Sequence, residues 1–231
     1  MTRKVVGILG GMGPEATILL QKRLLQIVDA QDDADHLPLL IDMNPQVPSR
    51  IAHLIEGTGP SPAPVLIEMA NRLEQAGATA LAMPCNTAHH YLPEIVDHLT
   101  VPFLDMIALS VARVAQSAET GARIGFLASP AVQIGGVFDK ALKQHGLTPA
   151  WPEQMDLLLS AIRDIKANGP TDRAAKILSD AASELEGKGA AQLIVACSEF
   201  SLTTSSLSAS IPVIDTVDVL ARAVRDHMIV S

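Results

Sequence analysis

The sequence predicts an α/β protein of two similar lobes, each with a mainly parallel sheet flanked by helices, the two related by pseudo-twofold symmetry. Three observations predict this fold. Short apolar runs alternate with segments of helical spacing, which is the pattern of strand–helix–strand units. Motifs of the first half recur in the second half in the same order. Nearly half of the 231 residues are apolar and 18% are charged, as is typical of globular α/β domains.

A first strand is expected at 5–9, where an apolar run stops at a cluster of glycines. A helix is expected at 15–30, because its apolar residues recur at helical spacing. A second strand is expected at 37–43, since this apolar run ends at Asn44-Pro45, a pair typical of turns.

Ser49 is expected to cap a short helix at 49–56, because a serine hydroxyl accepts hydrogen bonds from the first free N–H groups of a helix. Glycine and proline at 57–62 indicate a flexible loop. Helical spacing at 64–75 stops at a glycine, and the apolar run at 80–83 predicts a buried strand. Because strands and helices alternate, we expect parallel sheets covered on both faces.

Three blocks of the second half match blocks of the first. In the longest match, Gly77 and Gly189 each stand eight residues before a cysteine, Cys85 and Cys197 respectively. The matched blocks are "RLEQAGATALAMPCNTA" with "ELEGKGAAQLIVACSEF", "VPFLDMIALSVARV" with "IPVIDTVDVLARAV", and "VVGILGG" with "RIGFLAS". This order of matches indicates a duplication.

The duplication predicts the domain organisation. Lobe 1 is expected to comprise residues 1–103 and 213–231, and lobe 2 residues 104–212. Each lobe places one cysteine at the carboxyl end of a strand, where open α/β sheets bind ligands. A pseudo-twofold would bring the two thiols to opposite sides of one cleft, which is the expected active site.

Charge and cysteine content exclude several classes of partner. The net charge is −8 and the sequence has no basic cluster, so we expect neither a nucleic-acid nor a membrane partner. The charge-free run from Gln75 to Pro93 contains histidines, an asparagine and a proline, which a membrane span would not. Two cysteines are too few for a disulfide framework and fit a reducing compartment. A cytoplasmic protein with a small-molecule substrate is expected.

The two cysteines are the candidate chemistry. Each follows an apolar strand and precedes polar residues typical of a helix N-terminus, in "CNTAHH" and "CSEFS". We therefore expect the helix dipole to lower the pKa of both thiols. Two acid/base groups on opposite faces of a substrate suit inversion at a carbon atom: one thiolate removes a proton and the opposite thiol delivers one. This pattern favours cofactor-independent racemisation.

Alternative roles for these residues stay open. Cys85, His89 and His90 could contribute to a zinc site, although no Cys-x-x-Cys completes a ligand set. Cys85 and Cys197 could form a redox disulfide. His89 or His90 could serve as the base of a papain-like Cys/His pair, but a helix-cap or surface role is favoured for both histidines. Either cysteine could be an inert core residue.

The stretch "GILGGMGPEAT" predicts an anion cradle. Its Gly11-x-Gly13-x-x-Ala16 spacing formally matches the dinucleotide-binding fingerprint. Glu15 would repel a pyrophosphate, and the acidic residue expected after the next strand is replaced by "DMNPQVPSR", a loop that leads to Arg50. The exposed amides of such a loop suit a carboxylate equally well. We therefore expect a carboxylate cradle that faces Cys85.

"GGMGPEAT", "NPQVPSR", "CNTAH" and "ACSE" together resemble motifs of the aspartate/glutamate racemase family of PLP-independent amino-acid racemases. The resemblance spans almost the whole chain and keeps the motif order. It implies the two-lobed racemase fold, paired catalytic cysteines at Cys85 and Cys197, and no cofactor or metal. Family members often form dimers, so a homodimer is expected by analogy.

The resemblance also implies a substrate-binding set. The α-carboxylate is expected at the glycine loop and at the polar residues after each cysteine, and the side-chain carboxylate at an arginine and a lysine. By position these residues are Met12, Asn86, Thr87, Ser198 and Glu199, together with Arg50 and Lys166. Where the family commonly has a "T-x-G-T" turn this sequence has "FLASPAVQIGG", so Ser129 is the expected substitute donor.

The resulting expectation is a racemase of aspartate, glutamate or both. A decarboxylase or a cis-trans isomerase of a dicarboxylate would share the fold, but such relatives tend to use one cysteine. A nucleotide-binding oxidoreductase that uses the glycine loop, and a binding protein without turnover, are the remaining alternatives.

Overall fold

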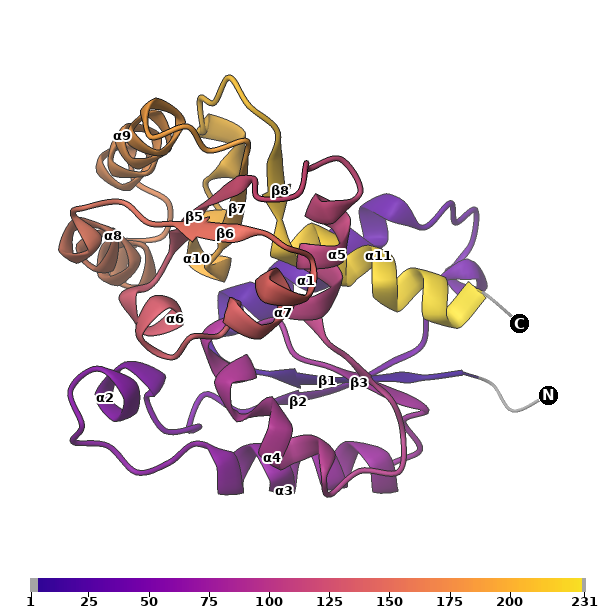
Figure 1. Ribbon diagram of the computed structural model, residues 1–231. Helices are drawn as coiled ribbons and strands as arrows, with labels where there is room; N and C mark the ends of the chain where they lie inside the picture. Colours follow the sequence, from indigo (N-terminus) through magenta and orange to yellow (C-terminus); the bar gives the residue numbers. More distant parts are fainter. Residues whose placement is uncertain (1–3, 230–231) are drawn as a thin grey trace. The chain divides into compact units, whose positions relative to one another are not determined.

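Two compact units make up the chain in the computed structural model, which describes residues 4–229 (Figure 1). One unit contains the residues up to Met106 and those from Val217 onward, and the other contains Ile107–Thr216. Residues 1–3 and 230–231, which the expected lobe 1 includes, lie outside the described residues.

The first unit contains a four-stranded parallel sheet of order β2–β1–β3–β4. Its strands are β1 (Val6–Gly10), β2 (Leu39–Met43), β3 (Ala80–Ala82) and β4 (Phe103–Leu104). Its helices are α1 (Pro14–Ile27), α2 (Arg50–Leu54), α3 (Ala63–Gln75), α4 (Leu92–Val96) and most of α11 (Thr216–Ile229), with 3₁₀ turns η1 (Asp33–Asp35) and η2 (Thr87–Tyr91).

The second unit repeats this topology with the sheet order β6–β5–β7–β8, again all parallel. Its strands are β5 (Arg123–Ala128), β6 (Thr148–Ala150), β7 (Gln192–Ala196) and β8 (Val213–Asp215). Its helices are most of α5 (Met106–Ala115), then α6 (Pro130–Ile134), α7 (Asp139–Gln144), α8 (Met155–Asn168), α9 (Asp172–Gly187) and α10 (Ser198–Ser201), with the 3₁₀ turn η3 (Thr204–Ser206).

The duplication seen in the sequence extends to backbone geometry. Gly77 and Gly189, which follow α3 and α9, have φ angles of 100° and 79°, in the left-handed region that favours glycine. The N–H group after each glycine donates a 3.0 Å hydrogen bond back into the helix, to the carbonyl of Leu73 in one unit and of Leu185 in the other. Each turn therefore redirects the chain into a central strand in the same way.

Alternation along the central strands places both cysteines on equivalent sheet faces. Leu81, Met83 and Cys85 belong to one apolar cluster with residues of α3 and α4, and Figure 1 shows these helices on one side of that sheet. Leu193, Val195 and Cys197 likewise share a cluster with α8 and α9. Since side chains two apart share a sheet face, each cysteine continues the buried row of its strand.

The predicted elements are found with shifts at their ends. The helix expected at 15–30 ends at Ile27, and the strand expected at 37–43 begins at Leu39. The Ser49 hydroxyl accepts a hydrogen bond from the N–H of Ala52 at 3.2 Å, which confirms the predicted cap. Within residues 4–229, no helix combines the length and apolar character needed to cross a membrane.

Two matched glycines let a helix pack closely on each sheet. A Cβ added to Gly7 would lie 3.0 Å from the Cβ of Leu73 in α3, and one added to Gly125 would lie 3.2 Å from the Cβ of Leu185 in α9. In both cases the added atom would also lie 2.6 Å from a leucine Cδ2 of the adjacent strand. The absence of a side chain is therefore a packing requirement at the same position of both repeats.

Substitution of Gly125 by alanine should destabilise the protein by about 1–3 kcal/mol, because the methyl group overpacks the interface between β5 and α9. The matched control is Gly187→Ala in α9, where an added Cβ meets no atom within 4 Å and the change should be neutral or stabilising by up to about 1 kcal/mol. Urea unfolding followed by circular dichroism measures both. Equal effects of the two substitutions would contradict the packing argument.

Candidate functional site

The carboxyl edge of the first sheet carries Cys85, three residues beyond the end of β3. The side chain is buried, with 6% of its surface exposed, and its N–H donates to the carbonyl of Met83 at 2.9 Å. Met12 and Val47, from the loops that follow β1 and β2, belong to the same buried cluster. The ends of three adjacent strands therefore meet around this thiol, as expected of a parallel sheet.

The glycine loop between β1 and α1 is tightly constrained. Gly11 has a φ of 91°, and a Cβ on it would lie 2.4 Å from the backbone of Asn44. The Gly11 N–H donates to the Thr17 hydroxyl at 3.0 Å. One amide of the predicted carboxylate cradle is therefore already engaged within the protein.

Arg50 begins α2, and its Nη1 donates to the carbonyls of Val47 at 3.2 Å and Pro48 at 2.8 Å. Both hydrogens of this nitrogen are used by the loop, so Nε and Nη2 are left to bind a carboxylate. The loop hydrogen bonds hold the guanidinium in place.

Tyr91 is a residue that the sequence interpretation missed. Its ring is buried and its hydroxyl has no hydrogen-bond partner among the described residues. Burial raises the pKa of Tyr91 to about 12; the charge of Arg50 opposes this rise, while Glu94 and Cys85 add to it. An orphaned buried hydroxyl beside an arginine and a thiol can serve as a ligand donor.

Asn86 and Thr87 follow Cys85 at the start of η2, a 3₁₀ turn and not the α-helix that the sequence indicated. Asn86 is buried and Thr87 is half-buried. η2 runs directly into α4, so the helical segment that begins beside Cys85 covers residues 87–96.

His89 is buried and forms a hydrogen bond with the backbone carbonyl of Cys85. Its Nδ1 donates to the Cys85 carbonyl at 2.8 Å, while its Nε2 accepts from the N–H of Met106 at 3.3 Å and lies 4.0 Å from a carboxylate oxygen of Asp105. Both ring nitrogens are occupied by backbone groups, so His89 is poorly placed to act as the base of a papain-like pair. The surface role considered for His89 is wrong because the side chain is buried, whereas the bond from Met106, the first residue of α5, agrees with the helix-cap role. His90 is exposed.

The carboxyl edge of the second sheet carries Cys197, the N-cap residue of α10, with 6% of its surface exposed. Its thiol donates to Oε2 of Glu199 at 3.0 Å, and Oε1 of the same carboxylate lies 3.2 Å from Nζ of Lys166 in α8. Ser198 is buried beside them. The structure thus brings together the predicted residues Cys197, Ser198, Glu199 and Lys166.

The expected activation of both thiols by helix N-termini is wrong for Cys197. Burial raises the pKa of its thiol well above the ordinary value, the Glu199 carboxylate adds to the rise, and Lys166 only partly opposes it. A helix of four residues has a weak dipole, so desolvation and the adjacent negative charge decide the outcome.

Ser129 directly follows β5 and Cys197 directly follows the neighbouring strand β7, and the last residues of the two strands, Ala128 and Ala196, are paired in the sheet. The Ser129 hydroxyl caps α6 by accepting from the N–H of Ala131 at 3.2 Å, and the hydroxyl hydrogen is left to donate. The predicted substitute donor is therefore at the same sheet edge as Cys197.

The predicted residues thus form two groups, one in each unit. Cys85, Met12, Asn86, Thr87 and Arg50 belong to the carboxyl edge of the first sheet, and Cys197, Ser198, Glu199, Lys166 and Ser129 to that of the second. Their convergence in one cleft stays a prediction.

A family model described as Asp/Glu/Hydantoin racemase matches residues 9–224. The chain belongs to this racemase family. The match confirms the resemblance inferred from the motifs, and membership supports racemase activity on amino acids.

Individual relatives of the racemase family agree with this assignment. The "Broad specificity amino-acid racemase RacX" of Bacillus subtilis (strain 168) is 26% identical over 227 residues, covering 95% of this chain and 96% of its own. The structure titled "Picrophilus torridus aspartate racemase" is 29% identical with a TM-score of 0.86, covering 97% of this chain and 94% of that one. A glutamate racemase from Francisella tularensis in complex with D-glutamate, 13% identical with a TM-score of 0.69, covers 99% of this chain and 81% of that one and shares the fold.

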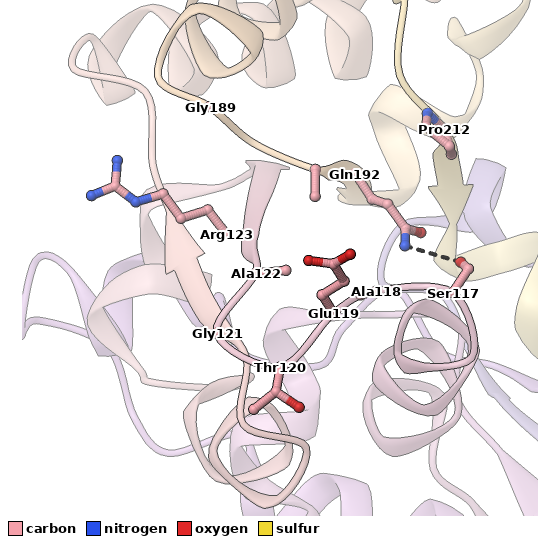
Figure 2. Close-up of a pocket in the computed structure, with 11 residues that line it drawn as sticks. Ser117, Ala118, Glu119, Thr120, Gly121, Ala122, Arg123, Gly189, Gln192 and Pro212 are labelled. Carbon is pink, nitrogen blue, oxygen red and sulfur yellow. Dashed lines mark hydrogen bonds between the residues drawn. The ribbon is translucent and has the colours of Figure 1, made fainter.

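A cavity of about 550 Å³ lies elsewhere in this racemase, at the amino ends of β5 and β7 (Figure 2). Arg123 and Gln192, the first residues of those strands, line it, and Gln192 Nε2 donates to the Ser117 hydroxyl at 3.1 Å. Its lining includes none of the predicted site residues.

Across residues 4–229, no three His, Cys, Asp or Glu side chains lie close enough together to form a metal site.

Protonation of His89 should destabilise the racemase in acid. Burial lowers the pKa of His89 below its ordinary value of 6.5, so the histidine contributes stability above pH 6.5 that is lost as pH falls below it. A second ring proton would also remove the acceptor of the Met106 N–H. The melting temperature of the wild type should therefore fall more steeply below pH 6.5 than that of His89→Gln. The exposed His98→Gln variant is the control and should follow the wild type; parallel curves for wild type and His89→Gln would refute this role.

Proposed function

We propose that the protein is a cofactor-independent amino-acid racemase that acts on aspartate, glutamate or both through Cys85 and Cys197. One observation carries the proposal: a buried cysteine stands at the same position of each repeat, after the equivalent strands β3 and β7, in sheets of the same order. Two inert core cysteines would remain at matched positions of a duplicated chain only by chance. Proton transfer on two faces of a substrate, in contrast, requires such a pair.

In the proposed reaction, one cysteine thiolate takes the α-hydrogen as a proton and forms an S–H bond. The electron pair of the broken C–H bond spreads into the α-carboxylate, where hydrogen-bond donors of the carboxyl edges stabilise the charge. The other cysteine gives its proton to the opposite face of the carbon and becomes a thiolate. The product is the mirror-image amino acid, and the reverse reaction uses the same groups in exchanged roles.

A dicarboxylic substrate is proposed because cationic side chains belong to both groups of predicted residues. The free Nε and Nη2 of Arg50 can bind a side-chain carboxylate as a fork, and the ammonium of Lys166 is a second candidate. The relative named as an aspartate racemase supports a dicarboxylic substrate. The relative named as a broad-specificity amino-acid racemase supports the alternative of a wider substrate range.

A decarboxylase or a cis-trans isomerase of a dicarboxylate is the alternative of the same fold, and a nucleotide-binding oxidoreductase is a more distant one. Retention of both cysteines favours racemisation. A homodimer in the cytoplasm is the proposed physical state, and sedimentation equilibrium of the purified protein tests the oligomer.

Incubation of the purified protein with L-aspartate or L-glutamate in D₂O, without added PLP, should give the D-enantiomer with deuterium at Cα. Deuterium is expected because each S–H group exchanges with solvent before it returns a proton. Cys85→Ser and Cys197→Ser should each lower the rate of inversion at least about 100-fold, since each removes one acid/base group. Chiral chromatography and mass spectrometry measure both quantities. Full inversion by either single variant would exclude the two-thiol mechanism.

Arg50→Gln should lower kcat/KM for aspartate about tenfold or more, because a charge-assisted hydrogen bond of about 1.5–3 kcal/mol is lost. The effect on alanine, which has no side-chain carboxylate, should be much smaller. The exposed Arg113→Gln is the control and should leave both substrates unaffected. An equal loss of kcat/KM for aspartate and for alanine would show that Arg50 does not bind the side-chain carboxylate.

A further inference from the structure

Cys197, Glu199 and Lys166 form a chain of contacts from a buried thiol to solvent. The Cys197 thiol donates to one oxygen of Glu199 at 3.0 Å, and the other oxygen contacts the Lys166 ammonium at 3.2 Å. Exposure rises along the chain, from 6% for Cys197 to 13% for the side chain of Glu199 and 41% for that of Lys166. These contacts engage Lys166 with a carboxylate of the protein itself.

The equivalent position in the first repeat lacks this arrangement. In the matched blocks "CNTA" and "CSEF", Thr87 stands where the second repeat has Glu199. A threonine hydroxyl carries no charge at neutral pH, whereas a carboxylate does. The two cysteines of the duplicated scaffold therefore face different electrostatic environments.

The environment of Cys197 favours the protonated thiol over the thiolate. Apolar residues of β5, α8 and α9 bury the sulfur, and burial disfavours a charge there. The charged groups that act on it are Glu199 of α10, which accepts the thiol proton in a hydrogen bond, and Lys166 of α8. The raised pKa of Cys197 agrees with this geometry, and Lys166 lowers that pKa.

We propose that the Glu199–Lys166 pair controls where the proton resides on Cys197, so that Cys197 rests as the acid and Cys85 acts first as the base. The inference rests on the proposed racemase function. Cys197 gives its proton to the substrate carbon and becomes a thiolate beside the Glu199 carboxylate. The ammonium of Lys166 offsets the resulting pair of negative charges, which makes Lys166 a positioning residue that acts through Glu199.

The experiment uses the fact that the chain has two cysteines. Cys85→Ser leaves Cys197 as the single thiol, and its ionisation is followed by the ultraviolet absorbance of the thiolate as pH is raised. The double variant Cys85→Ser/Cys197→Ser supplies the blank, which removes the contribution of Tyr91. This titration requires neither turnover nor access of a reagent to the buried sulfur.

Two further substitutions in the Cys85→Ser background should move the titration midpoint in opposite directions. Glu199→Gln removes the negative charge and leaves the ammonium, so the midpoint should shift to lower pH. Lys166→Met removes the cation and leaves the carboxylate, so the midpoint should shift to higher pH. Lys166→Arg keeps the charge and should stay near the parent midpoint.

Lys176→Met is the matched control, because Lys176 lies in the same unit but pairs with Asp180 on the exposed side of α9. It should leave the midpoint unchanged, and circular dichroism confirms that each variant is folded. Shifts of both test variants in the same direction, or no shift in either, would overturn the proposal. The titration midpoints of Lys166→Met and Glu199→Gln are measured separately. If one variant fails to fold, the midpoint of the other still tests the proposal.

The titration and the racemisation assay fail independently. If the titration midpoint shifts in opposite directions in Glu199→Gln and Lys166→Met but the protein shows no racemase activity, control of the Cys197 proton is supported and the proposed function is refuted. If racemisation needs both thiols but the midpoint of the Cys197 titration does not change on substitution of Glu199 or Lys166, the proposed function is retained and this inference is refuted.

Discussion

Parallel pairing of two central strands, β1 with β3 and β5 with β7, is the constraint on which the candidate site depends. In a parallel sheet the carboxyl ends of neighbouring strands meet at one edge, so loops far apart in sequence are brought together there. In the first unit this edge brings Met12 and Val47 to Cys85, and in the second it brings Ser129 beside Cys197. Without this pairing the cysteines would be ordinary core residues.

The side chain four positions after each cysteine makes a different contact in the two repeats. His89 donates to the Cys85 carbonyl, while the hydroxyl of Ser201 lies 3.4 Å from the Cys197 carbonyl and donates to Asp215 at 2.8 Å. Both residues stand four positions after their cysteine. The single hydroxyl hydrogen of Ser201 is used by Asp215, so the two repeats differ at this position.

A duplicated fold with unequal side chains is well suited to a reaction that needs both an acid and a base. At Cys197 burial favours the neutral thiol, because a thiolate is poorly solvated in an apolar cluster. A charged neighbour in one repeat and a neutral one in the other can separate the two protonation states without any change of scaffold. Glu199 and Thr87 provide this difference in the present chain.

Local sequence patterns were enough to predict the α/β class, the alternation of strands and helices, the Ser49 cap and the positions of both cysteines. These features follow from local periodicity, capping and the repeat of motifs, which depend on residues close together in the chain. The end of the first helix differs from the prediction: it was expected at residue 30 and lies at Ile27.

The environment of each candidate residue, by contrast, depends on how the chain folds in three dimensions. The sequence could not show that Lys166 of α8 contacts Glu199 of α10, or that the ring nitrogens of His89 bond to backbone groups on both sides. Nor could it show that the buried Tyr91 hydroxyl has no hydrogen-bond partner within residues 4–229. It also predicted a lowered pKa for Cys197 where burial and a carboxylate raise it. The physical reason is that desolvation and charge–charge interactions depend on distances through space, which spacing along the chain does not determine.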